Sequence, residues 1–134
     1  MSLTNDWVMQ QIEMMTRFVS QVIFNKTGQK ETISYTVENT ELLTDIDRLY
    51  LTLDQLIRER KICEAEDMLF DNLVFEDKYI ELASDFYGKL NNLSDEELSN
   101  ADFSREEIHD GYLDILTRLG VPVEQFRVWD SPNG

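Results

Sequence analysis

The residue types and spacing most suggestive of chemistry in this chain are those of Glu106 and His109, which stand three positions apart. On a helix, Glu-x-x-His places a carboxylate and an imidazole on one face, as in carboxylate-bridged di-iron bundles. Such a centre needs a second Glu-x-x-His, and this sequence contains only one histidine. A two-fold dimer would supply the second Glu-x-x-His motif. Binding of a metal or small ligand by Glu106 and His109 is therefore kept as the alternative hypothesis. The sequence predicts no resident cofactor.

A calcium loop is a second candidate, since its positions 1, 3, 5 and 12 would be filled by Asp95, Glu97, Ser99 and Glu106. Asn100 stands where such a loop needs glycine. The same segment contains Ser94-x-x-Glu97 and Ser104-x-x-Glu107, two capping boxes that mark the first turns of helices. Two solvated helix starts explain the segment better than a calcium site.

Cys63 and His109 form the one thiol–imidazole pair available for nucleophilic catalysis. No nucleophile motif surrounds either residue, and we expect Cys63 to be a half-buried structural thiol. There is also no glycine loop for phosphate and no Ser–His–Asp order. The sequence therefore favours a non-catalytic protein, although it does not decide whether the protein is an enzyme.

Composition narrows the class of partner. The 134 residues carry 27 acidic and 12 basic side chains, a net charge of −15, which argues against nucleic acid and against an anionic membrane. Most of that charge belongs to residues 61–134, where 18 acidic residues face 6 basic ones. The lone cysteine and the lack of a basic leader before the apolar N-terminal stretch predict a cytoplasmic protein. We assign no structural weight to residues 1–3, which could be an added leader.

The longest apolar segment covers residues 7–24, where the ladder 8, 12, 15, 19, 22 has helical period. Its apolar arc is wider than the stripe of an ordinary surface helix, so it needs cover on more than one side. One interpretation is a central core helix wedged between a helical hairpin and the last helix. The other is a dimer or partner interface made by Trp7, Met14, Phe18 and Phe24.

The remaining pattern predicts one all-α domain, residues 1–134, with five to six helices and short connections. Apolar residues with helical spacing predict helices over 41–60, 62–75 and 77–90. The first capping box predicts a short helix that ends near residue 100, and the second predicts a longer helix over 105–119. Residues 25–40 break the periodicity. Within them, 32–37 alternates like a short strand, but no partner strand is visible, so an irregular loop is favoured. We expect burial of Leu56, Leu69, Phe86 and Leu116.

Residues 53–73 resemble a tetratricopeptide hairpin, with a large–large–small–large pattern at Leu56, Ile62, Ala65 and Leu69. The following repeat is degenerate, because Glu96 stands at the position equivalent to Ala65, and Arg60 and Asn91 replace the usual glycines. One hairpin, packed with the N-terminal apolar helix and the C-terminal helix, is therefore expected.

The chain also resembles an uncharacterised family of small proteins from low-GC Gram-positive bacteria, through segments that touch most of its length. These are Asp6-Trp7 with residues 11–13, then residues 61–66, 85–87, 93–98 and 102–108. The resemblance implies a helical cytoplasmic domain and transfers no catalytic residue.

From these observations the sequence predicts a non-catalytic helical protein–protein interaction module. Its partner would be another protein or a second copy of the chain, bound through Trp7, Met14, Phe18 and Phe24. The acidic run from Glu64 to Asp77 is interpreted as a solvated face, with steering of a basic partner as the alternative.

Overall fold

The structure is a computed structural model that describes residues 5–27 and 44–126. Within these residues the chain is all-α, as predicted, and contains no strand. Its elements are α1 (Asn5–Thr27), α2 (Asp45–Arg58), α3 (Ile62–Asp71), α4 (Asp77–Asn91), α5 (Asp95–Asn100), α6 (Arg105–Arg118) and the 3₁₀ turn η2 (Glu124–Phe126). Residues 25–27, expected to be irregular, complete α1, and the predicted loop or strand at 32–37 lies outside the described residues.

Among the described helices, α2, α5 and α6 begin at a capping box, and the boxes of α5 and α6 were predicted. The hydroxyl of Ser94 accepts a hydrogen bond from the backbone of Glu97, whose carboxylate accepts one from the Ser94 backbone, both at 3.0 Å. Ser104 and Glu107 repeat this arrangement at the start of α6. The third box, Thr44 with Asp47, starts α2 at Asp45 rather than at residue 41. It was missed because aspartate is an unusual partner at the third helical position.

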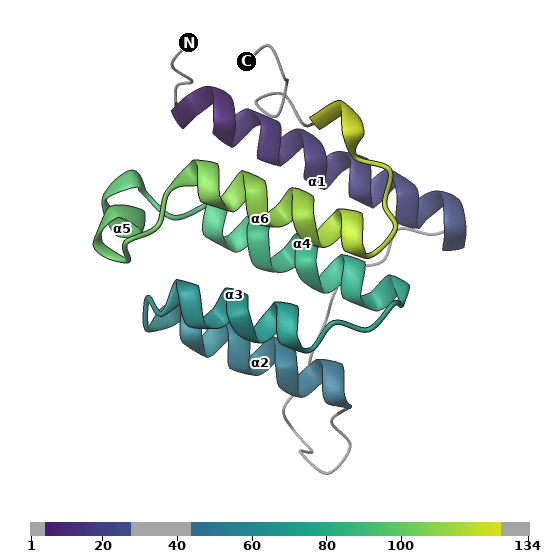
Figure 1. Cartoon of the computed structure of the whole chain (residues 1–134), viewed down its shortest axis with the longest axis horizontal. Helices are drawn as coiled ribbons and strands as arrows, with labels where there is room; N and C mark the ends of the chain where they lie inside the picture. The colour runs from purple at the N-terminus through teal and green to yellow at the C-terminus, as the bar shows by residue number, and fades with distance from the viewer. Residues whose placement is uncertain (1–4, 28–43, 127–134) are drawn as a thin grey trace.

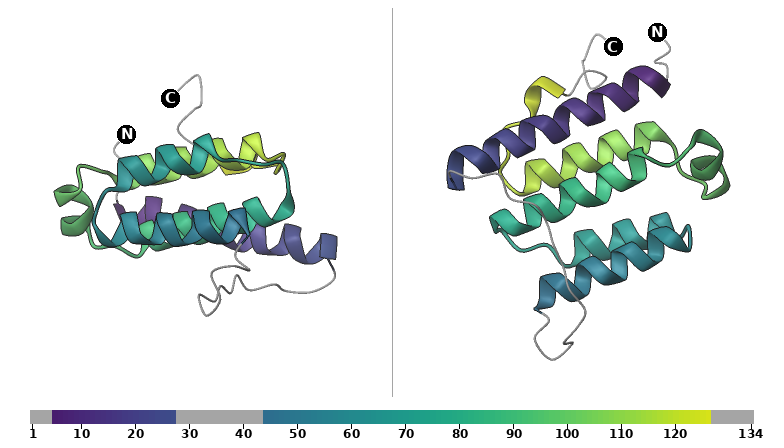
Figure 2. Two further views of the ribbon diagram at one scale, coloured as in Figure 1. Left: turned by 90° about the horizontal axis from the view of Figure 1, so that it is seen from below. Right: turned by 180° about the vertical axis from the view of Figure 1, so that it is seen from behind.

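α1, α4 and α6 pack against one another as a three-helix bundle, and α2 joins the α2–α3 hairpin to α4 (Figure 1). The hairpin lies on the side of α4 away from α1, and α5 lies at one end of the molecule (Figure 2). The prediction of α1 as the central helix is therefore wrong, because α4 occupies that place. The helix α4 buries eight residues, which lie on several of its sides: Tyr79, Ile80, Leu82, Ala83, Phe86, Tyr87, Leu90 and Asn91.

One row of apolar side chains on α1 is buried in the core, and the opposite side of the helix faces outward. The buried residues are Val8, Ile12, Met15, Val19 and Ile23. The predicted ladder ends wrongly at residue 22, because Val22 is only half-buried and Ile23 takes the core position. Val123 and Phe126 of the C-terminal segment are also buried.

Of the four residues expected to be buried, three are buried: Leu69, Phe86 and Leu116. Leu56 is only half-buried, because Leu53 and Ile57 take the inward positions of α2. Within the described part of the chain, no helix has the length and hydropathy needed to cross a membrane.

Candidate functional site

The predicted pair on α6 is split between two environments. Glu106 is exposed, whereas His109 is completely buried. The Nδ1 atom of His109 lies 3.6 Å from a carboxylate oxygen of the neighbouring Asp110. Among residues 5–27 and 44–126, no three His, Cys, Asp or Glu side chains are grouped to hold a metal ion. The geometry therefore does not favour a metal centre built on Glu106 and His109.

Two acidic side chains of the suggested calcium loop, Asp95 and Glu97, have partners elsewhere. Asp95 forms an ion pair with Arg105, at 2.9 Å from the guanidinium Nε. Glu97 accepts from the Ser94 backbone and pairs with Arg60, and these two contacts hold the pKa of Glu97 below its ordinary value. The carboxylates thus cap helices and join elements instead of converging on a cation.

Cys63 does not resemble a catalytic thiol. It is exposed at the start of α3, which corrects the expectation of a half-buried residue. Desolvation, together with the nearby charges of Glu107 and Glu66, raises the pKa of this thiol. A raised pKa lowers the thiolate fraction, which is the reactive form. His109 is buried in α6, so the sequence-level pairing of thiol and imidazole gains no support from the fold.

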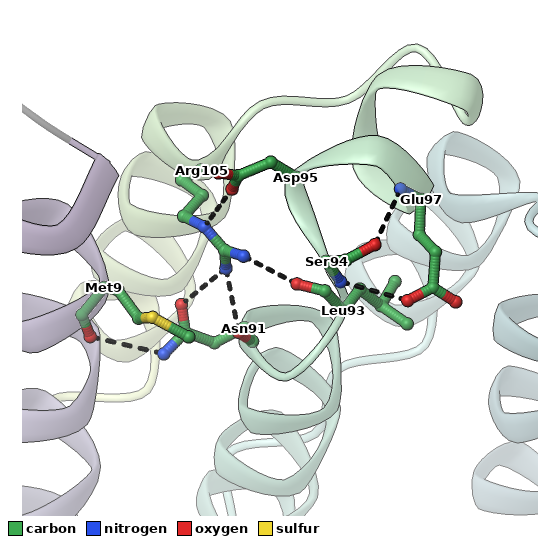
Figure 3. Close-up of polar contacts among 7 residues, drawn as sticks. All are labelled: Met9, Asn91, Leu93, Ser94, Asp95, Glu97 and Arg105. Carbon is green, nitrogen blue, oxygen red and sulfur yellow. Dashed lines mark hydrogen bonds and ion pairs between the residues drawn. The ribbon is translucent and has the colours of Figure 1, made fainter.

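A buried polar network, not recognised in the sequence, joins the ends of α4 and α6 (Figure 3). Arg105 is 5% exposed and donates to the backbone carbonyls of Asn91 and Leu93, at 2.8 and 2.6 Å, and to Asp95. The Asn91 side chain accepts from Arg105 and donates to the backbone of Met9 on α1. A guanidinium suits this place because it offers several fixed donors to carbonyls at a helix C-terminus. The network is structural and fixes the α4–α5–α6 corner.

The four predicted interface residues lie on the outer part of α1 but do not share one stripe. Met14 and Phe24 are 47% and 43% exposed. Trp7 and Phe18 are half-buried against the core, and the Phe18 ring lies 5.7 Å from that of Phe126 in η2. At about 100° per residue, Trp7, Met14 and Phe18 fall within an arc of about 40°, whereas Phe24 lies about 80° from Met14. Phe24 instead borders a shallow hollow of about 460 Å³ with Thr16, Arg17, Ser20 and Gln21.

A second surface feature is the groove between α3 and α6, with a volume of about 380 Å³. It is lined by Glu66, Phe70, Glu107, Asp110, Gly111 and Asp114. The acidic run on and after α3 is otherwise a solvated face, as predicted, but Glu66 is half-buried and accepts a hydrogen bond of 2.6 Å from the hydroxyl of Tyr87. A sequence signal existed, because Ile62, Ala65, Glu66 and Leu69 have the i, i+3, i+4, i+7 spacing of one buried helical stripe.

Gly111 allows this close approach of α3 to α6. A methyl group on its Cα would overlap the Glu66 carboxylate and lie 2.7 Å from the Tyr87 hydroxyl. Tyr87 is fully buried, stacks on Tyr112 with ring centroids 5.2 Å apart, and burial raises its pKa well above the ordinary tyrosine value. Tyr87 therefore remains protonated and donates to Glu66 at every physiological pH.

Taken together, these features define the class: an all-helical protein in which a three-helix bundle carries a helical hairpin and a buried polar network holds one corner of the bundle. The chain belongs to DUF6483, a family of unknown function whose model matches residues 2–120. Searches of the curated proteins and of the solved structures found no match. The expectation of an uncharacterised family is thus confirmed, and function has to be argued from the surfaces of the molecule.

Proposed function

We propose that the protein is a non-catalytic helical interaction module that binds a second copy of itself through the outer side of α1. The observation that carries this proposal is the distribution of charge. α1 contains two acidic and two basic residues, whereas residues 44–126 contain 21 acidic and 8 basic ones. Two copies of a strongly acidic protein repel each other when they meet through like-charged surfaces. The outer side of α1 is a surface on which they meet without that penalty.

The side chains on this surface suit a helix–helix contact. By the helical period, Gln10, Met14, Arg17 and Gln21 form the ridge opposite the buried ladder of α1. Trp7 and Phe24 lie about 50° to either side of this ridge. In an antiparallel pair centred near residue 16, Trp7 of one copy lies level with Phe24 of the other, on the opposite edge of the contact, so that the ridge is flanked by aromatic side chains at both ends in a self-complementary two-fold arrangement. Methionine and aromatic residues are enriched in such interfaces.

The test is sedimentation velocity over a concentration series for wild type and for Met14→Glu. Because Met14 is 47% exposed, the variant keeps its helical circular dichroism. Its new charge lies close to the two-fold axis and faces its own copy, so the dimer dissociation constant rises by about tenfold or more. Phe75→Glu is the matched control, since Phe75 is 76% exposed and lies between α3 and α4. A wild-type monomer at every concentration, or equal weakening by both variants, contradicts the proposal.

We further propose that the α2–α3 hairpin is a single tetratricopeptide-like unit. Ala65 is fully buried where the two helices approach closely, and Leu69 is buried one turn later. Arg60 in the connecting turn has a φ of 61°, the left-handed conformation that glycine adopts most easily in such a turn. We place the protein in the cytoplasm of a low-GC Gram-positive bacterium, on the basis of the lone thiol and the family resemblance described above.

A further inference from the structure

The α2–α3 hairpin contacts the bundle through two junctions of opposite electrostatic character. At the α2–α4 junction, Lys89 donates to the hydroxyl of Tyr50 at 2.9 Å and pairs with Asp54 and Asp85 at 3.2 and 3.0 Å. Partial burial disfavours the charge of Lys89, but these contacts outweigh burial and raise its pKa. This junction is electrostatically compensated, and it holds α2 on α4 over the whole physiological pH range.

The α3–α6 junction has an excess of carboxylates around Glu66. The titratable and charged groups around it come from three helices: Cys63 and Asp67 on α3, Tyr87 on α4, and Glu107, Asp110, Asp114 and Arg118 on α6. The cation in this set, Arg118, lies over the Phe70 ring and pairs with Asp114 at 3.1 Å. Glu66 itself has the neutral hydroxyl of Tyr87 as its hydrogen-bond donor.

We propose that the α3–α6 junction is a pH-sensitive switch, in which protonation of Glu66 tightens the docking of the hairpin on the bundle and ionisation loosens it. The geometry supports this coupling, because the Glu66 carboxylate lies against the backbone of Gly111, in a groove whose α6 wall carries three further carboxylates. Protonation removes the repulsion while the neutral carboxyl still accepts the hydrogen bond from Tyr87. The compensated α2–α4 junction then acts as the fixed side about which α3 opens or closes.

The direction of the effect follows from proton linkage. Desolvation, and the charges of Asp67, Glu107 and Asp114, raise the pKa of Glu66 against the opposing hydrogen bond from Tyr87. The docked state therefore binds the proton more tightly than the released state. Docking strengthens as the pH falls through the raised pKa, and the gain is complete below the ordinary glutamate pKa of about 4.3. Between these two values the docking equilibrium changes by up to about tenfold per pH unit.

The test compares wild type, Glu66→Gln and Glu64→Gln as full-length chains by hydrogen exchange of the α3 amides from pH 7.5 down to about the ordinary glutamate pKa of 4.3, corrected for intrinsic exchange rates. Glu66→Gln keeps an acceptor for Tyr87 but cannot ionise, so its α3 protection stays high and independent of pH. Wild type and the control Glu64→Gln, which loses an exposed charge on the same helix, gain protection as the pH falls. In parallel, carbon-13 titration of the Glu66 carboxyl in the folded chain reports its pKa directly. An ordinary glutamate pKa, or the same pH dependence in wild type and Glu66→Gln, overturns the proposal.

Discussion

Replacing Gly111 with alanine is expected to destabilise the protein, although the same change inside most helices stabilises them. Alanine is favoured over glycine in a helix interior by about 1 kcal/mol. At Gly111 the added methyl overlaps the Glu66 carboxylate and crowds the Tyr87 hydroxyl, so the hydrogen bond between those two side chains is lost. A hydrogen bond to a charged group contributes about 1.5–3 kcal/mol, so the net loss is about 0.5–2 kcal/mol.

Gly88 on α4 provides the matched control, because a methyl group built there meets no atom within 4 Å outside the adjoining residues and backbone of its own helix. Gly88→Ala is expected to gain about 0.5–1 kcal/mol from helix propensity alone. Both variants are measured by urea unfolding followed by circular dichroism at pH 7.5, with wild type in the same series. In a Tyr87→Phe background the penalty of Gly111→Ala should largely disappear, because the hydrogen bond is already absent. Equal stabilisation by both alanine variants refutes the close approach of α3 to α6.

Two further variants test the interior. Arg105→Ala is expected to lower the free energy of unfolding by about 2–4 kcal/mol, because it leaves buried carbonyls of Asn91 and Leu93 without their donor. A decrease of less than about 1 kcal/mol, measured by urea unfolding, would show that the network is dispensable for stability. Leu116→Ala, at a fully buried position, should lower the free energy of unfolding by about 2–5 kcal/mol. Leu56→Ala, at a half-buried position, should lower it clearly less. The reverse order of the two urea unfolding midpoints would place Leu56 in the core.

The helices, and the starts of α5 and α6, could be predicted from the sequence because the physical causes are local. The Ser94 and Ser104 capping boxes lie within a single turn, and the buried positions Leu69, Phe86 and Leu116 follow from helical period. The pattern reports which side of a helix is apolar, but not which helix covers it. For that reason α1 was expected at the centre, although α4 occupies that place.

The polar interior was harder to predict because it depends on contacts between residues far apart in the chain. Arginine and glutamate usually lie at the surface, so nothing local identified Arg105 as buried. For Glu66 the local signal was its place on the buried stripe of α3, which shows the side of the helix but not the partner that the carboxylate meets there. Both are held by partners on other helices: Arg105 by the end of α4, and Glu66 by Tyr87. The predicted interface residues lie on α1, and their role stays a prediction. The contact of Phe18 with Phe126 was not foreseen, because η2 packs there only through the tertiary fold.

Native mass spectrometry of chelator-free wild-type protein over a concentration series tests the proposed self-association most directly. It reports the assembly state and any bound mass in the same spectrum. A dimer without added mass, whose population grows with concentration, is the predicted result. A monomer at every concentration contradicts the proposal, and a monomer with a stoichiometric metal or small molecule would return attention to Glu106 and His109.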